Sequence, residues 1–316
     1  MSRVRGEVLD WFAARLVVPG KELAVLRAAE MIPSPAQWRA FLGQLALWLG
    51  TLALAAAVIF FFAFNWQDMS RFTKFGLVEA AIVASLLALW RLDLDGMAGK
   101  AVLTLLSLLV GALLALTGQI YQTGADTFEL FAYWAALLLP WVLISRFVPL
   151  WLIWLGILNL ASFLYFSLRQ DSEAFVWAPF LLNGVALIVW EAAHRAGLSW
   201  VDESWPPRLI AAASAAAASA LIFWAIFDGR GSSAILAFLA YSAWMAGLYV
   251  WYRRIRSDLF MLAAGLLSLI VAVAAFLSDK IVVTGDGAFL LIGLVVIAMS
   301  AVGAIWLKSF AQEQAA

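Results

Sequence analysis

One connection of the chain gathers the side chains best suited to bind a cation. It runs from Gly118 to Glu129 and contains no basic residue. Asp126 and Glu129 are three residues apart, so their carboxylates would lie on one face of a helix. Such a pair could receive a cation or a proton, and neutral groups nearby could complete the site. The neutral candidates are Gln119, Tyr121 and Gln122.

The same two acids also have a purely structural interpretation. Asp126 could occupy the N-cap of a helix and Glu129 its third position. Acids there accept hydrogen bonds from free N–H groups and complement the helix dipole. The sequence leaves both interpretations open.

A second polar group follows an aromatic run. Residues 60–64 read Phe-Phe-Phe-Ala-Phe, and Asn65, Gln67 and Asp68 come after them. An aromatic girdle closed by polar residues is typical of a membrane interface. Alternatively, Asn65, Gln67 and Asp68 face the acidic connection and form one site with it.

Three polar residues lie inside apolar runs. Glu79 is the most buried-looking acid; it could pair with Arg71 or Lys74, or it could couple a proton or ion to the site. Asn159 and Asn183 fall near the middle of two further runs. Hydrogen bonds between helices explain such residues more often than substrate contact does.

Composition limits the chemistry further. The chain of 316 residues has no cysteine and one histidine, which excludes thiolate nucleophiles, disulfides and clusters of histidine ligands. Lys plus Arg equals Asp plus Glu at 20 each, so no bulk charge attracts nucleic acid. No phosphate-binding loop or nucleophile elbow is present. We therefore expect no catalytic residue, no cofactor and no metal site.

The hydrophobic content places the chain in a membrane. Apolar residues make up 66% and charged residues 13%, and mean hydropathy is +0.97. A crossing helix needs about 20 mostly apolar residues. Runs of this kind predict an all-α, polytopic helix bundle with about ten spans. They are residues 42–64, 74–90, 101–118, 127–145, 148–168, 174–193, 208–227, 232–252, 258–277 and 286–307.

Two of these runs carry additional local signals. The fourth and fifth are separated only by the residues around Arg146 and Pro149, so the chain must turn tightly there. The low-complexity stretch Ala211–Ala220 offers small side chains on every helical face, which favours close helix packing.

Basic residues in the connections indicate the orientation. With the N-terminus inside, the inner segments hold 15 Lys and Arg and the outer loops hold 5. This asymmetry favours two cytoplasmic termini in a bacterial inner membrane and places the acidic connection outside. Arg253, Arg254 and Arg256 form an inner cluster that topology setting and anionic headgroups would explain.

Residues 1–40 form a small cytoplasmic segment or an interfacial anchor rather than a signal peptide. They are typical of two short amphipathic helices broken at Pro19 and Gly20. Ser34 and Gln37 then form a capping box, and the helix that begins there runs into the first span. Residues 41–308 are the transmembrane domain, and 309–316 are a short cytoplasmic tail.

Two stretches carry a family resemblance. Phe60–Trp66 and Gly118–Asp126 resemble the signature stretches of a bacterial family of predicted membrane proteins, the domain of unknown function DUF2157. The resemblance covers roughly residues 1–170. It implies a multi-pass architecture and assigns no catalytic residue.

Ten spans could also divide into two halves, residues 41–168 and 174–307, of opposite orientation, as in inverted-repeat transporters. The fourth helix of each half opens similarly, at Asp126 and at Asp258.

These observations favour a non-enzymatic membrane protein that binds or transports a small solute or cation through a polar outer mouth. The mouth residues would be Asn65, Asp68, Gln119, Tyr121, Gln122, Asp126 and Glu129, with Glu79 deeper. An alternative is a scaffold or envelope-signal sensor whose residues 1–40 bind a cytoplasmic protein. A membrane enzyme acting on lipid or an envelope polymer is the third possibility. The lipid bilayer is the partner that all three share.

Overall fold

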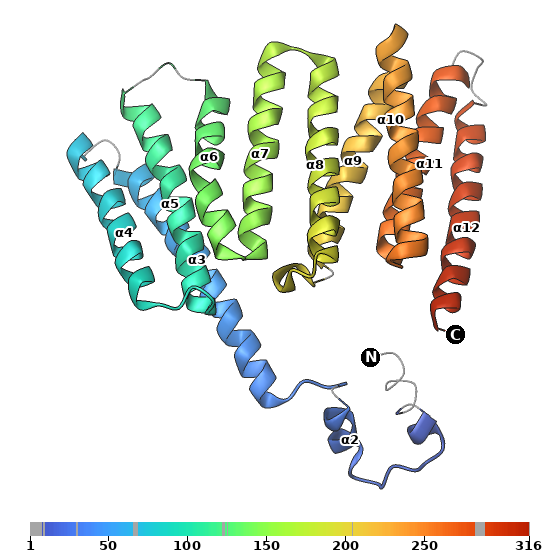
Figure 1. Cartoon of the computed structure of the whole chain (residues 1–316), viewed down its shortest axis with the longest axis horizontal. Coiled ribbons are helices and arrows are strands. Elements are labelled where there is room, and N and C mark those ends of the chain that lie inside the picture. Colours follow the sequence, from blue (N-terminus) through green and yellow to red (C-terminus); the bar gives the residue numbers. More distant parts are fainter. Residues whose placement is uncertain are drawn as a thin grey trace. The chain divides into compact units, whose positions relative to one another are not determined.

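The helical architecture is visible over most of the chain (Figure 1). The computed structural model describes residues 8, 10–29, 31–65, 69–121, 124, 126–203, 205–281 and 288–315. Within these ranges the chain forms helices and connections without a strand, which confirms the all-α prediction. It divides into two compact units, residues 1–123 and 124–314. The predicted halves divide elsewhere, at 169–173, and the inverted repeat stays a prediction.

The first unit is built around α5. Its helices are α2 (Glu22–Ala28), α3 (Pro35–Asn65), α4 (Arg71–Arg91) and α5 (Met97–Tyr121). Both α3 and α4 pack against α5, whose Leu103, Leu106 and Leu109 are almost fully buried. Spacings of three residues put these leucines on neighbouring positions of the helix surface.

The predicted capping box at the start of α3 is confirmed. The backbone N–H of Gln37 donates to the Ser34 hydroxyl at 3.2 Å, and the Ser34 N–H donates to the Gln37 side-chain oxygen at 2.7 Å. Two otherwise free N–H groups are thereby satisfied. The helix then continues without a break through residues 42–64, as the sequence predicts.

The second unit contains seven long helices among its described residues, together with two short ones. The elements are α6 (Thr127–Ser145), α7 (Val148–Arg169), α8 (Ser172–Arg195), η1 (Ser199–Val201), α9 (Trp205–Phe227), α10 (Gly231–Val250), η2 (Trp251–Ile255), α11 (Leu259–Ile281) and α12 (Ala288–Ala315). Consecutive helices from α6 to α9 pack in pairs, and α9 also contacts α10 and α11.

Helix α9 is the packing centre of this unit, and Figure 1 shows it between α8 and α10. Ala211, Ser214 and Ala218 have no exposed surface. Small side chains let the neighbouring backbones approach closely, so the prediction of close packing along residues 211–220 is confirmed. Polar contacts add to it: the Trp244 indole N–H of α10 donates to the Ser214 hydroxyl at 2.9 Å.

The tight turn between the fourth and fifth runs is also confirmed. Helix α6 ends at Ser145, and Arg146 takes the left-handed conformation with φ 46° and ψ 36°. Helix α7 begins two residues later, with Pro149 in its first turn. Proline is favoured at this position because its missing N–H would be unpaired anyway.

Nine helices in the described ranges are long and apolar enough to cross a membrane. They correspond to nine of the ten predicted runs, from residues 74–90 onward. The first run lies in α3, which has 31 residues. The total of ten crossings and the cytoplasmic location of both termini stay predictions.

Close approach of two backbones at Gly99 makes the first unit sensitive to a single methyl group. A Cβ at Gly99 would lie 2.2 Å from the carbonyl oxygen of Asp93, so Gly99→Ala must displace the α4–α5 connection. We expect it to lower the free energy of unfolding by roughly 1–3 kcal/mol. The control is Gly76→Ala in α4, where a Cβ meets nothing within 4 Å. Equal denaturation midpoints for both variants in detergent would contradict this account.

Candidate functional site

Five of the residues predicted to form the outer mouth lie in the first unit, and the structure describes the side chains of two of them. Gln119 and Tyr121 are exposed in the last turn of α5, and the Tyr121 ring lies 5.8 Å from that of Phe75. Asp68 and Gln122 lie outside the described residues, as does the side chain of Asn65 at the end of α3.

Asp126 and Glu129 lie at the start of α6, in the second unit. Asp126 occupies the N-cap position with extended backbone, but its side chain makes no capping hydrogen bond. The N–H of Glu129 donates instead to the Asp126 main-chain carbonyl at 3.0 Å. Asp126 is exposed and Glu129 is half-buried. Neither carboxylate forms an ion pair with a described residue.

At two other helix starts in the same unit, the acidic side chain does form hydrogen bonds. Asp171 of α8 accepts from the N–H of Ala174 at 3.0 Å. Asp258, whose local sequence resembles that of Asp126, accepts from the N–H of Phe260 at 2.9 Å and pairs with Arg208. The capping interpretation therefore describes the position of Asp126 but not its side chain.

Glu79 does not have the buried surroundings expected from the sequence. It is exposed on α4, and no ion pair joins it to Arg71 or Lys74 in the described part of the chain. Neighbouring Lys74 is instead buried. The reason is helical geometry: Lys74 and Val78 lie on the packed face of α4, and Glu79 is one residue further round.

The two asparagines meet as a pair between α7 and α8. The Asn183 amide donates to the Asn159 side-chain oxygen at 2.7 Å, and Asn159 donates back at 3.2 Å. Asn183 also donates to the Pro179 carbonyl and Asn159 to that of Leu155. These bonds confirm the helix-pairing interpretation, because they engage both side-chain amides within the protein.

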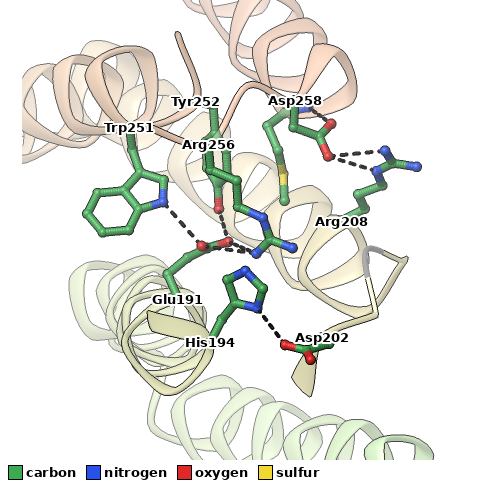
Figure 2. A network of polar contacts seen from close by, with 9 residues as sticks. Glu191, His194, Asp202, Arg208, Trp251, Tyr252, Arg256 and Asp258 are labelled. Carbon is green, nitrogen blue, oxygen red and sulfur yellow. Dashed lines mark hydrogen bonds and ion pairs between the residues drawn. The ribbon is translucent and has the colours of Figure 1, made fainter. Parts of the chain in front are cut away.

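A polar network that sequence reasoning missed surrounds Glu191, in the last two turns of α8. Glu191 is 5% exposed. Its carboxylate accepts from the Tyr252 hydroxyl at 2.8 Å, from the Trp251 indole N–H at 3.2 Å and from Arg256 at 3.0 and 3.1 Å. Figure 2 shows all three groups converging on the two carboxylate oxygens. A buried carboxylate is tolerated only when it is paired and hydrogen-bonded in this way.

Two further pairs lie beside this network (Figure 2). Arg208 of α9 contacts the Asp258 carboxylate at 3.1 Å, and His194 Nδ1 lies 3.3 Å from Asp202. Together with Glu191 they connect α8, α9, η2 and the start of α11.

The π-helical element η2 brings the partners of Glu191 into position. It follows α10 directly, and its wider turn changes the direction of the side chains that follow. Tyr252 lies within η2 and is buried, whereas Arg256 is the residue immediately after it. The sequence signal available was the arginine cluster. We expected this cluster to set the topology and to contact headgroups, and that expectation did not include the ion pair between Arg256 and Glu191.

An elongated groove of about 600 Å³ begins at this network. One wall is α8 and the other is α10 with η2; Gly184 and Gly247 lie on opposite walls, and Glu191 and Tyr252 lie at one end. The remaining lining is mostly aliphatic, so the groove has a long apolar part and a polar end. Its volume falls in the ~300–1,000 Å³ range typical of small-molecule sites.

Comparison with protein families identifies the N-terminal part. Residues 9–151 match the family model described as "Predicted membrane protein (DUF2157)". This region is similar to the DUF2157 family. The match confirms the family resemblance and includes both motifs that carry it. Comparisons with curated proteins and with solved structures found no match. The DUF2157 description and the apolar helices together make the chain a multi-pass helical membrane protein.

The network supports a stability prediction with an internal control. Glu191→Ala would leave Arg256 largely buried without its counter-charge, and we expect a loss of roughly 3 kcal/mol in the free energy of unfolding. Glu313→Ala removes the partner of Arg253 from an exposed pair, where Glu313 is 58% exposed. That loss should be much smaller because water screens the pair. Denaturation midpoints in detergent measure both, and equal midpoint shifts would contradict the assignment.

Proposed function

We propose that this protein binds a small cation at the acidic start of α6 and moves it, or a solute that accompanies it, through a polar mouth on the outer side of the inner membrane. The observation that carries the proposal is the state of Asp126. Its carboxylate occupies an N-cap position without a hydrogen bond or a counter-charge among the described residues. Asp171 and Asp258, at comparable positions, are both engaged.

Glu129 extends the cation site by one helical turn. Its spacing from Asp126 puts both carboxylates on one side of α6. Both acids lie at the positive end of the α6 dipole, where acidic side chains are favourable. A cation entering from water would therefore meet two carboxylates without displacing a basic side chain of the described residues.

The sequence assigns further residues to the polar mouth, and Glu79 to a deeper position; the mouth residues are Asn65, Asp68, Gln119, Tyr121 and Gln122. All of them belong to the first unit, where Gln119, Tyr121 and Glu79 are exposed. Their part in the mouth stays a prediction, and the cation site proposed here consists of Asp126 and Glu129.

The charge-neutral double variant Asp126→Asn with Glu129→Gln tests the site. Mn²⁺ is a suitable probe because it prefers carboxylate and carbonyl oxygen ligands and is detected directly by electron paramagnetic resonance. We expect the double variant to lose Mn²⁺ binding by tenfold or more, and proteoliposomes containing it to lose Mn²⁺ uptake. The denaturation midpoint should change little, because neither side chain caps α6 or forms an ion pair with a described residue.

The matched control is Asp171→Asn with Glu173→Gln, which makes the same changes at the start of α8. We expect this control to retain Mn²⁺ binding and to keep its denaturation midpoint nearly unchanged, because the Asn side-chain oxygen can cap α8 as the Asp171 carboxylate does. Unchanged Mn²⁺ binding in the Asp126 and Glu129 variant would remove the site.

A specific observation favours the scaffold or sensor as the second candidate. The N-terminal segment exposes Trp11 at 48%, Leu16 at 71% and Leu23 at 58%. Trp11 and Leu16 also line a hollow of about 310 Å³ with Lys21 and Val25. Exposed apolar side chains gathered in this way are typical of a surface that docks against a protein or a membrane.

Replacing the exposed apolar pair, Trp11→Ser with Leu16→Ser, separates the two candidates. If the protein acts as a cation binder, Mn²⁺ binding and uptake should stay within twofold of the unmodified protein, because the core of the site is remote in sequence. If it acts as a sensor, the variant should fail to complement a deletion strain while it binds Mn²⁺ normally. Complementation by this variant, together with failure of the Asp126 and Glu129 variant, would exclude the second candidate.

A further inference from the structure

The groove between α8 and α10 has one wall on each helix, and glycines on both walls keep it hollow. Leu181, Val185 and Ile188 line its α8 wall at helical spacing and are 54%, 56% and 69% exposed. The α10 wall combines the small residues Ala240, Ala243 and Gly247 with the larger Trp244 and Leu248. Beyond the Cα of Gly184 and that of Gly247, a Cβ would meet nothing within 4 Å, so both glycines leave the groove hollow.

The groove has the dimensions and polarity of a lipid chain. From Leu181 to Arg195 it follows α8 for roughly 21 Å, at ~1.5 Å per residue. One leaflet contributes about half of the ~30 Å hydrocarbon layer, so an extended acyl chain fits along this length. Its aliphatic lining offers hydrogen-bonding groups only at the end near Glu191, and hydrocarbon therefore fills it at lower cost than water.

The polar end of the groove carries an excess positive charge. The Glu191 carboxylate is already engaged with Arg256, Trp251 and Tyr252. Arg195 also lines the groove, is exposed, and lies 4.3 Å above the Trp251 ring. Within the described chain it has no carboxylate partner. A guanidinium held on an indole face at the end of an apolar groove is suited to a phosphate oxygen.

We propose that this groove binds one phospholipid with an anionic headgroup, its acyl chain between α8 and α10 and its phosphate on Arg195. The aromatic residues Trp251 and Tyr252 support the assignment, since such side chains are enriched at the level of lipid headgroups. The lipid site lies within the second unit and is independent of the cation site at α6.

Native mass spectrometry of the detergent-purified full chain tests the proposal with two probes, phosphatidylglycerol and phosphatidylcholine. We expect the unmodified protein to bind one phosphatidylglycerol about fivefold more tightly than phosphatidylcholine, in keeping with one Lys or Arg acting on an anionic headgroup. Arg195→Gln should abolish this preference and weaken phosphatidylcholine binding less than phosphatidylglycerol binding, because both lipids carry the phosphate but only phosphatidylglycerol has a net negative headgroup. The control Arg254→Gln removes an exposed cation that does not line the groove and should keep the preference.

Filling the groove provides a second, independent variant. Gly184→Leu with Gly247→Leu should weaken binding of both lipids by tenfold or more, while Gly156→Leu, at an open position on α7, should not. The denaturation midpoint of each variant shows that it is folded. A phosphatidylglycerol preference that survives Arg195→Gln would overturn the proposal. So would a dimer that dissociates when the groove is filled, because a second copy would then be the occupant.

Discussion

The hydrocarbon layer contains no water, and this constraint accounts for most of the structure. Each backbone N–H and C=O group that enters the layer must find its partner within the chain, and the helix provides that partner locally. Polar side chains in the apolar helices also form hydrogen bonds within the chain. The Thr51 hydroxyl donates to the Leu47 carbonyl and Ser107 to that of Leu103, each at 2.8 Å along its own helix. Such residues enter the apolar spans without needing solvent.

Features specified by neighbouring residues could be predicted from the sequence. Apolar runs of about 20 residues, Ser34 with Gln37, and the short connection at Arg146 each define their structure within a few positions. The alanine-rich stretch was equally informative, because small side chains permit close packing whatever the neighbour is. The helical character of the chain, the approximate positions of its apolar helices and the close packing along residues 211–220 therefore followed from local physics.

The polar network at Glu191 could not be predicted, because its partners are 60 to 65 residues away. Their approach depends on which helices pack against α9 and on the π-helical turn of η2, and the alanine-rich stretch specifies neither the partners of α9 nor that turn. The contrast between Asp126 and Asp258 has the same origin. Both acids begin a helix in similar local sequence, but only Asp258 has Arg208 within reach. Residue type located the candidates, and tertiary structure decided which ones are free.

The Asn159–Asn183 pair has a consequence for how the second unit responds to its surroundings. Side-chain amides neither gain nor lose a proton in the physiological range and carry no net charge. The transmembrane potential acts on charges, so it exerts no direct force on this pair. Helices α7 and α8 are therefore joined by a contact indifferent to both acidification and depolarisation. A direct response of the unit to a change of pH must therefore begin at its ionisable side chains, elsewhere than at this contact.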